Sequence, residues 1–187
     1  TNPSVISSVN INPYGGVTSV AVKNGIVAVA SPNADETLNG SIVFFNNNGT
    51  FLNQVTVGAL PDMITFSPDG TKVMTANEGQ PNTDYSIDPE GSVSIVDISG
   101  GIASLSQSNV TTLLFTAYNT QEATLIASGV RKLKSTSTLS QDFEPEYITI
   151  SADSQKAWVT LQENNAIAEI NLTNNTISDV WALGTKD

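Results

Sequence analysis

Apolar and polar residues alternate along much of this chain, in short runs rich in β-branched side chains. Four such runs follow one another near the start: VTSVAV (17–22), IVAVAS (26–31), SIVFFN (41–46) and FLNQVTV (51–57). Alternation with a period of two is typical of half-buried β-strands. Asn24-Gly25 and Asn48-Gly49 separate the pairs of runs, and Asn-Gly readily adopts the positive φ angles of tight hairpin turns. The pattern therefore predicts a four-stranded antiparallel sheet.

Two further groups of the same kind follow. The second comprises MITFS (63–67), KVMTAN (72–77), SVSIVDI (92–98) and a weaker run near 102–112, and the third comprises YITIS (147–151), KAWVTL (156–161), AIAEINL (166–172) and TISDVWAL (176–183). Val20 and Ile64 hold the same place in the first two groups and are 44 residues apart, whereas Ile64 and Ile148 are 84 residues apart. A spacing of about 40 to 45 residues is typical of four-stranded propeller blades. The longer interval indicates an insertion.

We therefore predict an all-β fold, a β-propeller segment of about three four-stranded antiparallel blades with one short helical insertion. The blades are expected at about 15–58, 59–112 and 145–184, and the insertion at 113–144. Within the insertion, residues 121–128 predict a helix that is capped by Asn119 or Thr120 and ended by Gly129. Residues 134–141 read as a loop. A β-sandwich is the alternative fold, but turn residues repeated at matching offsets favour the propeller.

Three blades do not close a ring, since propellers have about four to eight. We expect the remaining blades to come from the same polypeptide, from another copy or from a partner chain. The first residues, TNPSVISSVNINP, lack the basic and apolar regions of a signal peptide, which does not exclude secretion if the chain is an excerpt or a processed product. No apolar run reaches the roughly 20 residues of a membrane-spanning helix.

Charge and composition narrow the classes of function. The chain has 7 Lys and Arg residues against 18 Asp and Glu residues, a formal net charge of −11. Nucleic acids are therefore excluded as partners, because binding them requires basic side chains, and divalent cations are favoured. Cys and His are both absent, which removes disulfides, thiolate nucleophiles, imidazole bases and imidazole metal sites. No residue is assigned a catalytic role.

An acidic residue follows a proline at the start of two strands, in LPDMITFSPDG (60–70) and FEPEYITISAD (143–153). In a propeller blade, the start of the innermost strand and the end of the second strand lie on the same rim. Six carboxylates are placed at that rim and are candidate metal ligands: Asp62, Glu78, Asp88, Glu90, Glu146 and Glu163. Clustered carboxylates raise one another's pKa unless a cation compensates, and hard oxygen ligands suit Ca²⁺. The alternative is that these acids are simply solvated. Asp69 and Asp153 belong to turns at the opposite rim and are interpreted as structural.

Seven segments of the chain together resemble the choice-of-anchor I family of secreted bacterial β-propeller proteins. Some members of that family are described as alkaline-phosphatase-like, and the family is related to mesenchyme-specific cell-surface glycoproteins. The resemblance covers nearly the whole chain and rests on GGVTSVAVKNGIVAVA (15–30), VTVGALPDMITFSPDG (55–70), ANEGQPNTDYSIDPEGSVSIVDISGG (76–101), FTAYNTQEATLIASGVR (115–131), QDFEPEYITIS (141–151), AWVTLQENNAIAEINL (157–172) and LGTKD (183–187). It implies an extracellular or surface-anchored protein with further blades on both sides.

Three functions are consistent with these observations. The leading hypothesis is an extracellular or cell-surface propeller with a structural or binding role, stabilised by Ca²⁺ at the acidic rim. The second is a metal-dependent phosphoesterase in which bound metal ions hold phosphate and activate water. The third is a protein-interaction subunit of a larger surface assembly, whose acidic rim recruits a basic partner. The absence of Cys and His favours the non-enzymatic hypotheses.

Overall fold

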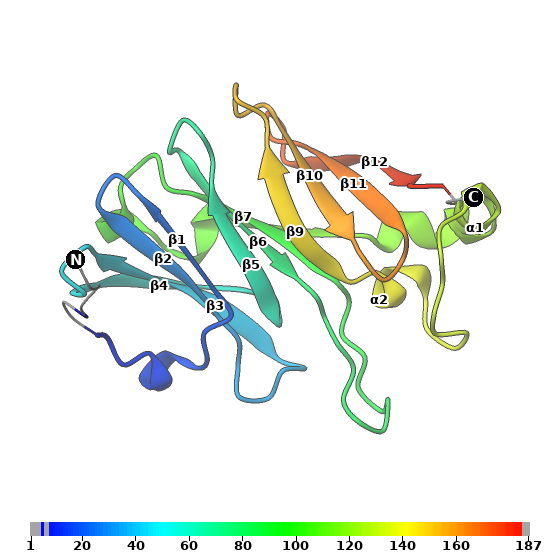
Figure 1. Ribbon diagram of the computed structural model, residues 1–187, viewed down its shortest axis with the longest axis horizontal. Helices are drawn as coiled ribbons and strands as arrows, with labels where there is room; N and C mark the ends of the chain where they lie inside the picture. Colours follow the sequence, from blue (N-terminus) through cyan, green and yellow to red (C-terminus); the bar gives the residue numbers. More distant parts are fainter. Residues whose placement is uncertain (1–4, 6–7, 185–187) are drawn as a thin grey trace.

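The computed structural model describes residue 5 and residues 8–184, and its strands form three four-stranded antiparallel sheets arranged like a fan (Figure 1). In each sheet, strands that follow one another in the sequence are neighbours in space. Blade 1 consists of β1 (Ser19–Lys23), β2 (Ile26–Ser31), β3 (Asn39–Asn46) and β4 (Phe51–Ala59). Blade 2 consists of β5 (Pro61–Phe66), β6 (Lys72–Asn77), β7 (Ser92–Asp97) and β8 (Val110–Leu114). Blade 3 consists of β9 (Pro145–Ile150), β10 (Lys156–Leu161), β11 (Ala166–Asn171) and β12 (Thr176–Ala182). The predicted three-blade propeller segment is confirmed.

The turns follow the predicted chemistry at most positions, with one difference in blade 2. Asn24 and Gly25 have φ angles of 50° and 78° between β1 and β2, as a tight Asn-Gly hairpin requires. The prediction of a weak strand near 102–112 is wrong over most of that range, because β8 begins only at Val110. Two short 3₁₀ helices, η2 (Ile102–Ser104) and η3 (Gln107–Asn109), precede β8 instead. The Asn109 side chain closes η3 by accepting a hydrogen bond from the backbone N–H of Ser106 at 2.9 Å.

The hydrophobic core lies between the blades. Between blades 1 and 2 it includes Ile42, Phe44 and Val73, which are fully buried. The cluster between blades 2 and 3 is larger, because Phe115 and Phe143 of the insertion pack against the strand residues there. Their rings lie edge to face with centroids 5.4 Å apart. The insertion is thus part of the second blade boundary.

The insertion contains more helix than predicted. The helix α1 (Glu122–Ser128) ends at Gly129, which has a φ angle of 111° as expected, but neither Asn119 nor Thr120 caps it. The 3₁₀ helices η1 (Asn12–Tyr14) and η4 (Thr116–Gln121) lie before β1 and α1, respectively. A short helix α2 (Leu139–Asp142) replaces the end of the expected 134–141 loop. Thr138 and Gln141 form a reciprocal capping box around its first turn, which explains why it is helical.

The two outer blades each leave one face open. On blade 1, Val20 and Val22 are 58% and 66% exposed. On blade 3, Tyr147 and Trp181 are 66% and 44% exposed. The three-bladed unit is therefore a partial propeller whose outer faces are suited to further blades or partners. Among the described helices, none has the length and apolar character needed to span a membrane.

Candidate metal centre

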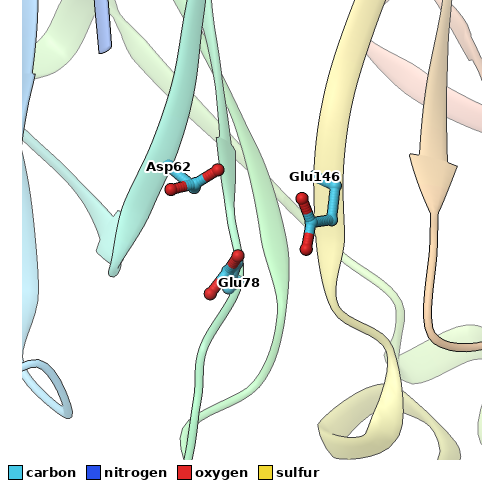
Figure 2. A group of neighbouring side chains, drawn as sticks. All are labelled: Asp62, Glu78 and Glu146. Atoms are coloured by element: carbon cyan, nitrogen blue, oxygen red, sulfur yellow. The ribbon is translucent and has the colours of Figure 1, made fainter. Parts of the chain in front are cut away.

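Asp62, Glu78 and Glu146 meet at the boundary between blades 2 and 3, and each offers a carboxylate oxygen within 4.8 Å of the others. Asp62 is the second residue of β5, and Glu146 is the second residue of β9. Glu78 directly follows β6. Figure 2 shows the carboxylates of Asp62 and Glu146 facing each other across the gap between their strands, with Glu78 beside them. We call these three residues the carboxylate cluster.

Backbone contacts bring the cluster residues together. The backbone N–H of Glu78 donates to the carbonyl of Leu60 at 2.9 Å, which fixes Glu78 beside the start of β5. Gly91, just before β7, allows the start of blade 3 to approach closely, because a Cβ atom there would overlap the carbonyl oxygen of Phe143 and lie 2.7 Å from Cδ of Pro145. The start of β9 therefore packs closely against the start of β7, and Glu146 lies at the boundary that Asp62 and Glu78 share.

Glu78 is the most constrained member of the cluster. The residue as a whole is only 8% exposed, and no N–H or O–H group of the described residues donates a hydrogen bond to its carboxylate. Burial, followed by the charges of Asp62 and Glu146, raises the pKa of Glu78 to about 8. Burial also raises the pKa of Glu144, opposed by the nearby Lys134. A buried carboxylate without a donor is an unfavourable arrangement that either a proton or a cation relieves.

The structure places Asp88 and Glu90 outside the cluster. Both lie in the long loop between β6 and β7, and both accept hydrogen bonds from the insertion. The hydroxyl of Ser137 donates to Oδ2 of Asp88 at 2.6 Å, and the hydroxyl of Ser140 donates to Oε1 of Glu90 at 2.9 Å. The ammonium of Lys134 lies 3.5 Å from Oδ1 of Asp88. These two acids therefore attach the loop to the insertion.

Glu163 lies in the short turn between β10 and β11 and is not a member of the cluster. Its charge contributes to raising the pKa of Glu144. The strand pairing explains the difference from Glu78. Asn77 pairs with Ser92 and Leu161 pairs with Ala166, so Gln162, rather than Glu163, holds the position that corresponds to Glu78.

Lys134 is the main residue that sequence patterns did not single out. Its ammonium lies 3.3 Å from Oε1 of Glu144, two residues from Glu146 of the cluster, and it comes from the stretch predicted to be a loop. A lysine in an irregular segment carries no periodic signal, so its position depends on how the insertion folds back over blade 2. It supplies the compensating charge for Glu144 and Asp88 but makes no salt bridge to the cluster residues.

The cluster can hold a hard divalent cation. Three carboxylates supply only oxygen ligands, which suit Ca²⁺ and Mg²⁺ better than transition metals. A Ca²⁺ ion accepts about six to eight oxygens at 2.3–2.6 Å, so bidentate carboxylates, backbone carbonyls or water would complete its shell. The crowding of the Glu78 carboxylate against those of Asp62 and Glu146 is the observation that fits such an ion, because a cation would offset their mutual repulsion.

Comparisons with known proteins concern the fold and the family. The chain matches the choice-of-anchor I domain over residues 1–187. No curated protein matches it. Similar solved structures include a protein of unknown function from Desulfotomaculum acetoxidans (TM-score 0.54, 15% identity, 90% of this chain and 44% of that chain). A eukaryotic initiation factor has a TM-score of 0.54 and 13% identity, over 92% of this chain and 33% of that chain. The β-propeller domain of the Trilobed protease from Pyrococcus furiosus has a TM-score of 0.48 and 11% identity, over 90% of this chain and 42% of that chain. The chain spans less than half the length of each of these structures.

Proposed function

The chain belongs to the choice-of-anchor I domain family, and from this premise we propose that it is part of a secreted or cell-surface β-propeller with a structural or binding role, stabilised by Ca²⁺ at the carboxylate cluster. The family description supports the location, and the propeller fold supports the binding role. The cluster carries the proposal for calcium, because its members come from two blades. An ion bound there would join β5 and the end of β6 to β9.

Calorimetric titration of the full chain with CaCl₂ tests this proposal. We expect one Ca²⁺ ion per chain to bind, with a matched titration in MgCl₂ reporting the preference between the two ions. Glu146→Gln should abolish binding, because it removes a charged ligand while keeping the side-chain volume. Asp153→Asn, at the opposite rim, is the control and should bind as the unchanged protein does. Equal calcium binding by both variants would refute the assignment of the cluster.

Phosphoester hydrolysis is the alternative function. Ca²⁺ in the cluster could hold a phosphate oxygen and lower the pKa of a bound water. Against this, Lys134, whose partner Glu144 is two residues from Glu146, is already paired with Asp88 and Glu144. We therefore expect no calcium-dependent turnover of p-nitrophenyl phosphate. Turnover that Glu146→Gln abolishes would replace the binding role with an enzymatic one.

We also propose that further blades cover the two open faces, supplied by the same polypeptide, another copy or a partner chain. The pairing of Val20 with Val29 corresponds to that of Ile64 with Thr75. Ile64 is buried against blade 1, whereas Val20 is exposed on the equivalent face. Because the position is apolar in both blades, a blade-like sheet is the partner that fits. Co-expression with flanking propeller sequence should protect Val20 from solvent, which hydrogen exchange of β1 would measure.

A further inference from the structure

A hollow lies near the carboxylate cluster, between the β6–β7 loop and the insertion. Figure 1 shows this loop projecting from the blades. Its volume is about 370 Å³, and Gln80, Asn82, Thr83, Tyr85, Lys134 and Glu144 are among the residues that line it. This volume falls within the range of about 300–1,000 Å³ that is typical of small-molecule sites. The hollow is separate from the three cluster residues, none of which lines it.

The loop that forms one wall is held in a fixed shape by its own hydrogen bonds. Asn82 closes the loop tip: its backbone N–H donates to the carbonyl of Ile87 at 3.0 Å, and its Oδ1 accepts from the N–H of Ile87 at 3.1 Å. The base is fixed through Asp88, which accepts the hydroxyl of Ser137. Gln141 also donates to the carbonyl of Asp88 at 2.9 Å. The wall is therefore formed before any ligand arrives, which lowers the entropic cost of binding.

Tyr85 is the residue that points to a ligand. It is 65% exposed, and its φ angle of 58° lies in the left-handed region that a bulky residue rarely adopts. This conformation belongs to a turn in which the N–H of Tyr85 donates to the carbonyl of Asn82 at 3.0 Å, and the turn leaves the ring exposed at the hollow. A tyrosine ring offers a flat apolar face together with a hydroxyl group, and it is a frequent anchor at binding surfaces.

The charges and polar groups of the hollow select the class of ligand. Lys134 and Glu144 are paired at 3.3 Å, so the lining presents no net charge. An anion would meet a lysine that already has two acidic partners. The side chains of Gln80 and Thr83 make no hydrogen bond with any described residue, which leaves an amide and a hydroxyl available to a ligand. The lining thus combines an aromatic face with uncharged hydrogen-bonding groups.

We propose that this hollow binds a neutral saccharide, whose C–H face packs on the ring of Tyr85 and whose hydroxyls bond to Gln80, Thr83 and the Lys134–Glu144 pair. The proposal gives the binding role above a ligand class and rests on that role, but it needs no cation in the carboxylate cluster. Calcium binding and saccharide binding can therefore fail independently.

Saturation-transfer NMR on the full chain in EDTA tests the proposal, with cellobiose, maltose, lactose and N,N′-diacetylchitobiose as probes. We expect transfer to at least one of them, with a Kd of about 1 mM or tighter. Tyr85→Ala should weaken that binding by about tenfold, the loss of one aromatic contact, while Tyr85→Phe should retain most of it. Trp181→Ala, which removes another exposed aromatic residue from β12, is the control and should change nothing.

Three results would overturn the proposal. The first is an absence of saturation transfer to all four saccharides. The second is equal transfer in the unchanged protein and in Tyr85→Ala. The third is binding of a charged probe, either putrescine or inorganic phosphate, that depends on Tyr85. The last result would assign the hollow to a charged ligand. Loss of binding in Gln80→Ala with an unchanged melting temperature would strengthen the assignment, because Gln80 has no structural partner to lose.

Discussion

The two rims of the blades carry acidic residues from the same repeated sequence, yet their carboxylates have different surroundings. At the turn rim, Asp69 accepts hydrogen bonds from the hydroxyl of Ser67 at 2.6 Å and the N–H of Thr71 at 3.0 Å. Asp153 repeats this arrangement with Ser151 and Gln155. These bonds lower the pKa of both aspartates. At the opposite rim, no described residue donates to Glu78, and its pKa is raised to about 8.

The difference indicates how to separate a structural carboxylate from a candidate ligand. A carboxylate that accepts local N–H and O–H groups is already compensated and has little to gain from a cation. A carboxylate that is partly withdrawn from water and faces two others has lost some of its hydration and meets their repulsion. Repetition of an acid in the sequence is therefore informative only together with the donors that surround each copy.

The largest expected effect concerns the pH dependence of stability. Without a cation, Glu78 has a pKa of about 8 in the folded protein against an ordinary value of 4.5. The folded state then holds a proton that the unfolded state releases, so the free energy of unfolding should fall as pH rises from about 4.5 to 8. The fall is about 5 kcal/mol at most, and on the order of 3 kcal/mol when solvent screening of this partly solvated carboxylate is included. Urea denaturation in EDTA measures this fall. Glu78→Gln should remove it, and an identical slope in that variant would show that another group is responsible.

Calcium should reverse that trend. Binding requires the ionised carboxylates, so added Ca²⁺ should stabilise the folded state increasingly as pH rises. At 100 times its Kd, the gain is about 2.7 kcal/mol, or roughly 5–10 °C in melting temperature for a chain of this size. Thermal melts at pH 8 with CaCl₂ or EDTA measure the shift. Asp69→Asn should retain the shift, whereas a shift retained by Glu78→Gln would place the ion elsewhere.

A substitution at the blade boundary should affect both stability and calcium binding. Gly91→Ala places a methyl group against the carbonyl of Phe143 and Cδ of Pro145, and overpacking of this kind costs about 1–3 kcal/mol. Since Pro145 precedes Glu146, the displacement should also weaken calcium binding, as calorimetry would show. Gly100→Ala is the control, because a Cβ atom there meets only Oγ of Ser104 at 3.5 Å. Unaltered calcium affinity in Gly91→Ala would separate the cluster from this packing contact.

The smallest effect is expected at the turn rim. Asp69→Asn weakens the hydrogen bonds from Ser67 and Thr71 and should cost about 1 kcal/mol. The contribution of Asp69 should be present above its ordinary pKa of 3.8 and decline as pH falls through its lowered value in the folded protein. Chemical denaturation at pH 7 and pH 3 measures this difference. If Asp69→Asn lowered the free energy of unfolding by as much at pH 3 as at pH 7, the role given to the ionised carboxylate would be contradicted.

The repeat in the sequence was sufficient to predict the fold, because strand alternation and Asn-Gly or Pro-Asp-Gly turns are local signals. The prolines at 61 and 145 likewise placed the following acids at the starts of inner strands, where β5 and β9 begin. Which acids meet could not be predicted, because it depends on contacts between blades. Asp88 and Glu90 bond to hydroxyls of the insertion, and no sequence pattern places Ser137 and Ser140 beside them.

The helical segments show a similar limit. The helix predicted at 121–128 forms at 122–128 and ends at Gly129 as expected. In contrast, α2 is only four residues long, and its capping box lies within a serine- and threonine-rich stretch. The hollow beside Tyr85 depends on the fold of both the β6–β7 loop and the insertion. Sites formed by two irregular segments carry no periodic signal, so they emerge only from the three-dimensional structure.

A high-resolution crystal structure of the chain grown in CaCl₂ most directly tests whether one ion joins blades 2 and 3. Our account predicts a single density peak between Asp62, Glu78 and Glu146, with carboxylate oxygens from both blades at about 2.3–2.6 Å. A cluster without such a peak in saturating calcium, or a calcium ion held instead by Asp69 or Asp153, would contradict it.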